Sequence, residues 1–438
     1  MKFIPFTQMM AAVVLAFAPF AGRANWTVDT STKIATMTDE NGIVLSCDIA
    51  DGNLSVYFSS STSTLNGQTL VDLSKPVEGG YVITAIKEQA FDKNGTIQGI
   101  VLPDTLVSVG RAAFRQCSAL TSISPCLPAS VSFVGDQAFY NAPKLAVEVT
   151  LSNPDLTSVL GSTFRGTPIT KVDLRGSGVV NIGEYAFENC KSLERVLQSK
   201  PFASIGQYAF SVCEKMAGTI DLSSPDCTEL ANNIFATCKS LEGVKLSPAL
   251  RSIGKSAFNG CTVLSSVEPF LPPSVTNVSD TAFNKCAIAN KRLEFGSRVL
   301  VVIGASAFNT STGGAIGLPE SVVFTAAPKS IGGSAFGGVY PKSIEFRDLP
   351  PREVGSWAFA SKGALSEVFI LPKHLLAEWQ VYLDPDTYGR VRLTLAEKNT
   401  YRANFAGYPR ATEKSKFPSL SSLQYVAYRG AGFQLLVR

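Results

Sequence analysis

The stretch IGEYAFENCKSL, which runs from Ile182 to Leu193, decides the fold because the chain repeats it many times. The strings IGQYAFSVCEKM, IGKSAFNGCTVL and VGRAAFRQCSAL begin at Ile205, Ile253 and Val109 and keep the same pattern. Aligned on their phenylalanine, the copies fall at Phe91, Phe114, Phe139, Phe164, Phe187, Phe210, Phe235, Phe258, Phe283, Phe308, Phe336 and Phe359. Neighbouring copies lie 23 to 28 residues apart, and a repeat of this length is typical of a solenoid.

Within one unit, the apolar residues recur at the spacing of one helical face. Ile182, Ala186 and Cys190 stand four residues apart, and Leu193 completes the pattern. This spacing predicts a short helical turn in each unit, with the phenylalanine filling the interior. Gly183 opens the turn, at a point where we expect a side chain to crowd the neighbouring backbone.

Two short extended segments connect one predicted turn to the next. The first is LEGVKL (Leu241–Leu246), in which alternation places Val244 inward and Lys245 outward. A proline-marked bend and a second extended segment follow. Stacked once per unit, the first segments predict a parallel sheet in which each unit touches only its neighbours. We therefore expect an α/β repeat solenoid of about twelve units over residues 81–372, with the sheet on one face and short helical turns opposite.

The two ends of the chain depart from the repeat. Residues 1–24 combine a lysine, an apolar run and small residues, which predicts a secretory signal peptide. The apolar run is 13 residues long, shorter than the roughly 20 that cross a bilayer as a helix. Alternating residues over 25–80 predict a small β cap at the N-terminal end. Residues 373–438 predict a helix-plus-strand C-terminal cap and tail, with a helix-like run from His374 to Leu383 and strands at the end.

The unit IGxxAFxxCxxL with its Leu-Pro bend resembles the leucine-rich repeat of the BspA-like surface proteins, the LRR_5 type. The resemblance covers about residues 80 to 372. Members of that family are typically exported or surface-exposed, and several are associated with adhesion to host proteins or other cells. The resemblance therefore implies a secreted or cell-surface protein, with the periplasm as a further destination.

Composition argues against catalysis and against nucleic-acid binding. A net charge of +4 over 438 residues provides no concentrated basic stripe. The single histidine, His374, cannot build a His-rich zinc site, and no serine or cysteine motif accompanies it. Asp384 and Asp386 form an acidic pair of a kind common in turns, so they make a weak catalytic candidate. We therefore expect a protein without enzymatic activity, metal or cofactor.

Six of the nine cysteines occupy the same slot, three residues after the repeat phenylalanine. They are Cys117, Cys190, Cys213, Cys238, Cys261 and Cys286. Other units have alanine, threonine, serine or valine in this slot, so it requires a small residue of modest polarity. We interpret the six as buried free thiols. A disulfide between stacked copies remains the alternative.

The outward-facing strand positions carry charges of both signs. The candidate partner-binding residues are Glu148, Lys171, Asp173, Arg195, Asp221, Lys245, Glu268, Arg292, Glu294, Glu345 and Arg347. An acidic ridge edged by basic side chains suits a protein or carbohydrate partner through charge complementarity and hydrogen bonds. A solvated sheet face, on which neighbouring charges merely balance, is the plainer interpretation.

The sequence thus predicts a non-enzymatic exported repeat protein that binds a protein or glycan through its strand face. A structural component of the cell envelope or surface layer, which contacts copies of itself, is the alternative. Concentration-dependent assembly would favour that alternative, and the oligomeric state stays open. No segment after residue 24 has the length and hydrophobicity of a transmembrane helix.

Overall fold

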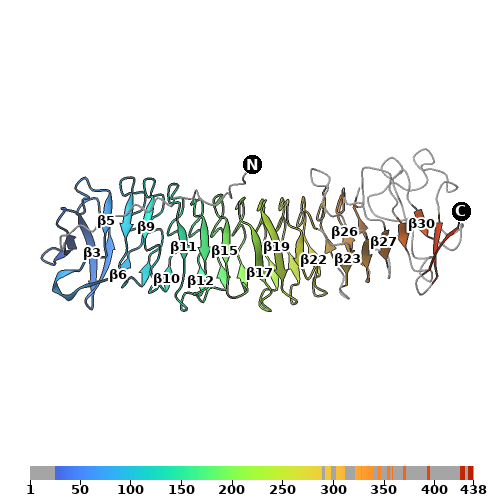
Figure 1. Ribbon diagram of the computed structural model, residues 1–438, viewed down its shortest axis with the longest axis horizontal. Coiled ribbons are helices and arrows are strands. Elements are labelled where there is room, and N and C mark those ends of the chain that lie inside the picture. The colour runs from blue at the N-terminus through green and yellow to red at the C-terminus, as the bar shows by residue number, and fades with distance from the viewer. Residues whose placement is uncertain are drawn as a thin grey trace, which may run out of the picture.

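The protein is an elongated solenoid in the computed structural model, with its strands running across the long axis (Figure 1). The structure describes residues 25–288, 292–296, 302–310, 321–326, 328–338, 343–346, 353–355, 358, 368–370, 392–394, 425–429 and 433–437. These residues make a β-solenoid of about 10 turns. The proposed signal peptide, the last repeat phenylalanine Phe359 and the run from His374 to Leu383 lie outside them.

One parallel stack, which we call the strand face, contains the first extended segment of each unit. Its strands are β5 (Leu70–Asp72), β7 (Gly99–Val101), β9 (Ser122–Ser124), β11 (Glu148–Thr150), β13 (Lys171–Asp173), β15 (Arg195–Leu197), β17 (Gly218–Leu222), β19 (Leu241–Leu246), β21 (Ser266–Glu268), β23 (Arg292–Phe295), β25 (Ser321–Phe324), β27 (Ser343–Phe346), β29 (Val368–Ile370) and β30 (Arg392–Thr394). Hydrogen bonding divides them into four sheets, β5-β7-β9, β11-β13-β15, β17-β19-β21 and β23-β25-β27-β29-β30. In β13, Val172 is buried between two partly exposed neighbours, as a period of two requires.

The second extended segment of each unit forms a second parallel stack. Its strands are β6 (Val82–Ile86), β8 (Ser108–Val109), β10 (Phe133–Val134), β12 (Ser158–Val159), β14 (Asn181–Ile182), β16 (Ser204–Ile205), β18 (Glu229–Leu230), β20 (Ser252–Ile253), β22 (Asn277–Val278), β24 (Val302–Ile303), β26 (Ser330–Ile331) and β28 (Glu353–Val354). Wherever burial is described from β8 onward, the second residue of the pair is a buried valine, isoleucine or leucine. The two stacks therefore enclose one continuous apolar core.

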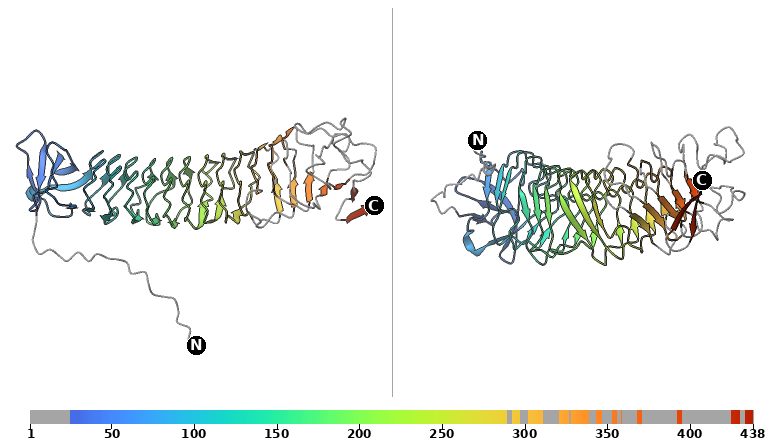
Figure 2. Two further views of the ribbon diagram at one scale, coloured as in Figure 1. Left: turned by 90° about the horizontal axis from the view of Figure 1, so that it is seen from above. Right: turned by 45° about the vertical axis from the view of Figure 1, so that its right-hand side comes forward.

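Antiparallel strands close the N-terminal end of the solenoid (Figure 2). They are β1 (Thr27–Asp29), β2 (Ala35–Thr38), β3 (Val44–Ala50) and β4 (Asn53–Tyr57), and a short 3-10 turn, η1 (Glu78–Gly80), follows. Strand β4 then pairs in parallel with β6 and so continues the second stack. Trp26 is fully buried, and its Nε1 donates a hydrogen bond of 2.9 Å to the carbonyl of Asp72. Because Asp72 belongs to β5, the strand face already begins inside the segment 25–80 that we expected to be a cap.

The strands expected at the C-terminal end of the chain are present. Strands β31 (Tyr425–Arg429) and β32 (Phe433–Val437) pair antiparallel as a hairpin.

The prediction of helical turns is wrong, and so is the prediction of an α/β fold, because the described residues contain no α-helix. In the unit from Ile182, Tyr185 and Asn189 have φ values of 58° and 61°. A residue with positive φ cannot continue a right-handed helix. The equivalent two positions of most other described turns also have positive φ, so left-handed residues interrupt most turns twice.

Backbone hydrogen bonds explain why this conformation is stable. The N–H groups of Tyr185, Phe187 and Asn189 donate to carbonyls of the next turn, at 2.8–3.0 Å. The N–H groups of Ala186, Glu188 and Cys190 donate instead to carbonyls three residues earlier, at 3.1–3.3 Å. Alternate amides thus join successive turns into a third ladder, which we call the turn face.

The repeat phenylalanines form one column through the core, as the sequence predicts. From Phe91 to Phe336, neighbouring rings stack with centroids 5.1–5.5 Å apart and planes within 16° of parallel. The centroid spacing exceeds the roughly 4.8 Å between strands, as offset rings require. Each of these rings is at most 3% exposed.

Candidate binding surfaces

The outward side chains of the strand face form rows across neighbouring strands. Glu148 lies opposite Lys171, which lies opposite Arg195. Asp173 lies in the adjacent row, with Thr150 as its partner in β11. Glu148 therefore does not share a row with Asp173, although an alignment by sequence places them together.

The shift arises from the spacer between turn and strand. The inward residue Val149 follows its phenylalanine by ten residues, whereas Val172 follows by eight. The spacer therefore changes the alignment of the outward residues without disturbing the buried column.

Several charges on the strand face are neutralised within the chain. Lys171 Nζ lies 3.0 Å from Glu148 Oε2. Arg175 forms a bidentate pair with Asp173, at 2.9 Å from Nε to Oδ1 and 2.7 Å from Nη2 to Oδ2. These hydrogen bonds from Arg175 lower the pKa of Asp173.

Farther along the strand face, Arg292 Nε lies 3.0 Å from Glu294 Oε2. Charges that already have a partner lose these contacts when they bind another molecule, so they make weaker candidates for recognition.

The middle of the strand face is different. Asp221, Lys245 and Glu268 lie opposite one another on β17, β19 and β21, and within the described residues none of them forms an ion pair. The same holds for the exposed Arg195 on β15. Gln198 follows β15 in the chain. Its side chain accepts a hydrogen bond from the backbone amide of Asp221 at 3.0 Å and donates one to the backbone carbonyl of Asp221 at 3.2 Å. We call Arg195, Asp221, Lys245 and Glu268 the central charged patch.

Glu345 and Arg347 are the two predicted residues nearest the C-terminal end of the strand face. Glu345 lies on β27 opposite Val323 of β25. Arg347 lies outside the described residues.

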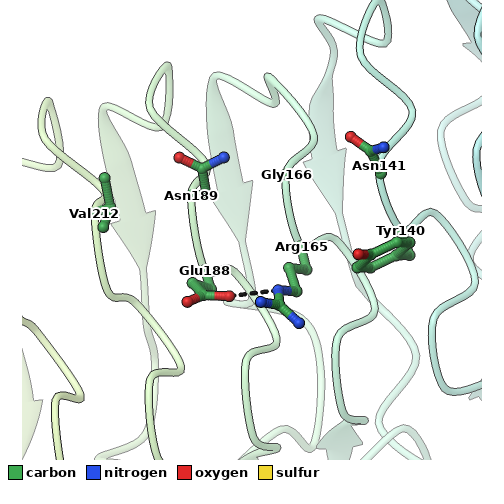
Figure 3. A pocket seen from close by; sticks show the side chains of 7 residues that line it. All are labelled: Tyr140, Asn141, Arg165, Gly166, Glu188, Asn189 and Val212. Carbon is green, nitrogen blue, oxygen red and sulfur yellow. Dashed lines mark ion pairs between the residues drawn. The ribbon is translucent and has the colours of Figure 1, made fainter.

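A hollow of about 330 Å³ lies on the turn face, where sequence analysis predicts no site. Its lining consists of Tyr140, Asn141, Arg165, Gly166, Glu188, Asn189 and Val212 (Figure 3). Gly166 lies between Asn141 and Asn189 in successive turns, so the absence of a side chain there opens the hollow. The sequence does carry one sign of this hollow: Gly166 occupies a position where the units before and after it have Asn141 and Asn189. Only the stacking of three turns, however, brings these residues together.

Arg165, one of the lining residues, makes contacts that hold its side chain in place. Its Nε forms an ion pair with Glu188 Oε2. Its guanidinium carbon lies 4.8 Å from the ring centroid of Tyr185 and 5.8 Å from that of Tyr140. Tyr185 in turn stacks on Tyr208, with centroids 5.1 Å apart. Charge pairing and cation–π contacts together restrict the arginine side chain.

The cysteine slot contains free thiols, as interpreted from the sequence. All nine cysteines lie among the described residues, and all are free. Cys190 Sγ donates to the carbonyl of Phe164 in the preceding turn, at 3.0 Å. Thr167 occupies the same slot one turn earlier, and its Oγ1 donates to the Phe139 carbonyl at 2.6 Å.

Burial raises the pKa of both Cys117 and Cys190 to about 12. These thiols are therefore unsuited to nucleophilic chemistry at neutral pH.

Among the described residues, no group of three or more His, Cys, Asp or Glu side chains could hold a metal ion. His374, Asp384 and Asp386 lie outside the described residues. The described part of the chain also contains no helix with the length and hydrophobicity of a membrane span.

Comparison with known proteins identifies the repeat. The family model for the BspA type leucine-rich repeat region matches residues 84–217, 157–290 and 228–323, which together span more than half of the chain. A search of curated proteins found no match.

Three solved structures are similar. A leucine-rich repeat protein from Bacteroides ovatus is 19% identical, with 75% of this chain and 90% of that chain covered and a TM-score of 0.47. The pneumococcal vaccine antigen PcpA is 14% identical, with coverages of 84% and 98% and a TM-score of 0.36. A leucine-rich cell surface protein from Faecalibacterium prausnitzii is 16% identical, with coverages of 78% and 94% and a TM-score of 0.34. With its stacked phenylalanines and the family model over residues 84–323, the chain belongs to the BspA-type leucine-rich repeat family.

Proposed function

We propose that this protein is an exported, non-enzymatic binding protein that engages a partner protein through the central charged patch. The observation that carries the proposal is that some charged side chains of the strand face are paired within the chain and others are not. Glu148, Lys171 and Asp173 are paired within the chain, whereas Lys245 and Glu268 are exposed and have no ion-pair partner among the described residues. Exposed, unpaired charges steer a partner and fix its orientation.

The pattern of signs favours a protein over a polyanion. Along the row, Asp221, Lys245 and Glu268 alternate between negative and positive, at the roughly 4.8 Å spacing of neighbouring strands. A polyanion would meet two repulsive charges in this row. The strands β17, β19 and β21 contain no aromatic residue, so they lack a ring face on which a sugar would pack. A folded protein with alternating charges fits better.

Export and surface exposure belong to the same proposal. Residues 1–24 have the composition of a signal peptide, and repeat families of this kind generally act as scaffolds rather than enzymes. Self-association, as in an envelope or surface-layer component, is the competing function. Light scattering over a range of protein concentrations separates them: a monodisperse monomer supports binding of a foreign partner, and growth of the particles with concentration contradicts it.

A binding screen with matched charge variants tests the proposal. The purified protein is applied to an array of secreted and cell-surface proteins, together with glycans, and each hit is measured by surface plasmon resonance. We expect a protein hit whose affinity falls at least about tenfold, or about 1.4 kcal/mol, in the double variant Lys245→Glu, Glu268→Lys. Its association rate should also fall as salt rises.

Lys255→Glu and Glu229→Lys provide the control, because both residues are exposed and lie away from the strand face. The control variants should bind as the unmodified protein does. Unchanged binding in the patch variant, equal loss in the controls, or hits among glycans alone would contradict the proposal.

A further inference from the structure

The hollow on the turn face offers hydrogen-bonding groups that the chain itself does not use. The side-chain amides of Asn141 and Asn189 form no hydrogen bond with the other described residues. They lie on either side of the open space above Gly166 (Figure 3). Each amide presents both a donor and an acceptor, so the pair can bind a ligand group that does both.

Arg165 adds donors that are held in place. Its ion pair with Glu188 uses Nε, and both Nη groups lack a hydrogen-bond acceptor among the described residues. Arg115, at the same position two turns earlier, differs because Asp92 accepts hydrogen bonds from both its Nε and its Nη2, at 2.8 and 2.6 Å. Asp92 thus holds Arg115 by two hydrogen bonds, whereas both Nη groups of Arg165 keep their donors for a ligand.

The lining carries no net charge. Arg165 and Glu188 are its only charged residues, and they neutralise each other. An anionic ligand would therefore gain little from Arg165, because the carboxylate of Glu188 lies next to it. Neutral groups with both donors and acceptors, such as hydroxyls, match the lining better.

The ends of the hollow are less polar. Tyr140 closes one end and Val212 the other (Figure 3). An aromatic ring beside polar groups presents an apolar face for C–H groups as well as a hydroxyl. The volume of about 330 Å³ falls at the lower end of the range of small-molecule sites, which suits a short unit rather than a folded surface.

From these observations we propose that the hollow formed by Tyr140, Asn141, Arg165, Gly166, Glu188 and Asn189 is a binding site for a neutral saccharide unit. The ring hydroxyls of the sugar bind the two asparagine amides and the Nη groups of Arg165, and its C–H face packs against Tyr140. This site lies on the turn face and is independent of the central charged patch on the strand face.

A glycan array tests this site directly. The array carries neutral hexose and N-acetylhexosamine oligosaccharides with their sulfated and sialylated counterparts, and each hit is measured by isothermal titration calorimetry with the free oligosaccharide. We expect binding to one or more neutral oligosaccharides. Absence of neutral hits, or hits confined to the sulfated and sialylated members, would overturn the proposal.

A variant that fills the hollow locates the binding. Gly166 has a φ of 70°, a conformation that asparagine tolerates, and a Cβ there would lie 3.5 Å from Asn141 Oδ1, an ordinary contact. We expect Gly166→Asn to weaken neutral-glycan binding at least tenfold. The matched control is Gly260→Asn, in the same column with a φ of 80° and its nearest contact at 3.6 Å, which should bind normally.

A second variant removes an amide without filling the space. Asn189 has a φ of 61°, which glycine adopts without strain, so Asn189→Gly deletes only the side chain. We expect it to weaken binding as well, while Lys245→Glu on the strand face leaves glycan binding unchanged. Full binding by both Gly166→Asn and Asn189→Gly would place the glycan elsewhere and refute the assignment.

Discussion

At the scale of the residue, close contact between turns decides which side chains the repeat accepts. Eight of the twelve second-stack strands are followed by a glycine that lies directly against the backbone of the preceding turn, whereas Lys87, Leu160, Ala231 and Ser279 follow the other four. A Cβ built on Gly206 would lie 2.5 Å from the amide nitrogen of Glu184. Gly206 does not have positive φ, so the requirement for glycine comes from the space and not from the conformation.

The substitution Gly206→Ala should therefore destabilise the protein. The new methyl group meets backbone atoms that cannot move without shifting a turn, and overpacking of this kind costs about 1–3 kcal/mol. Gly296→Ala is the control, because no atom of the described residues lies within 4 Å of its Cβ position, and it should change the stability by less than about 0.5 kcal/mol. Urea unfolding followed by circular dichroism measures both. Equal stability of the two variants would contradict the close contact.

Thiol reactivity should report the burial of the cysteine column. Eight of the nine cysteines are buried, and Cys126 is partly exposed. Because burial raises the pKa of thiols such as Cys117 and Cys190 to about 12, the thiolate is scarce at neutral pH. Iodoacetamide, with labelling read by mass spectrometry, should modify at most Cys126 in the folded protein and all nine after unfolding in denaturant. Rapid labelling of Cys190 in the folded protein would show that the column is open.

At the scale of the element, the sequence predicts the buried positions well and the backbone of the turn poorly. Ile182, Ala186 and Cys190 are buried as their spacing requires. The same spacing, however, satisfies both a helix and a turn with two left-handed residues. Tyrosine at position 185 gives no sign of positive φ, because bulky residues rarely adopt it. The hydrogen bonds to the next turn that stabilise this conformation exist only once the units stack.

An ion pair between two turns should make part of the stability depend on pH. Arg115 donates two hydrogen bonds to Asp92, which lower the pKa of that carboxyl below 3.8. A depressed folded-state pKa stabilises the protein above the unfolded-state pKa, and this contribution is lost as the pH falls through the folded-state value. Asp92→Asn should therefore cost about 1 kcal/mol near pH 7.

The comparison of Asp92→Asn with the unmodified protein is repeated by urea unfolding at about pH 7 and about pH 2. The difference in stability should shrink at the lower pH, because the Asp92 carboxylate takes up a proton as the pH falls through its lowered folded-state pKa. A difference that stays constant across this range would mean that the pair with Arg115 contributes no charge-dependent stability.

At the scale of the whole molecule, the stacking of the units arranges equivalent residues in columns and rows. The phenylalanine column was predictable, because every unit carries the residue at nearly the same spacing. The outward rows were only partly predictable: the spacer after Phe139 is two residues longer than the spacer after Phe164, so Glu148 lies beside Lys171 rather than in the row of Asp173. The hollow was not predictable, because residues of separate turns line it.

The long, regular stack also separates two surfaces with different chemistry. The strand face carries Arg195, Lys245 and Glu268, which have no ion-pair partner among the described residues, whereas the hollow on the turn face is neutral and contains two side-chain amides. Since each turn of a solenoid contacts only its neighbours, substitutions on one face should leave the other intact.

Site-specific photocrosslinking tests the claim that the strand face is where a partner binds. A photoreactive amino acid replaces Lys245 on β19 or, as the control, the exposed Glu229 on β18 of the second stack. Each form is illuminated with the partner protein found in the array, and the covalent adducts are identified by mass spectrometry. We predict strong adducts from position 245 and none from position 229. Adducts from position 229 alone, or equal yields from both positions, would contradict the account.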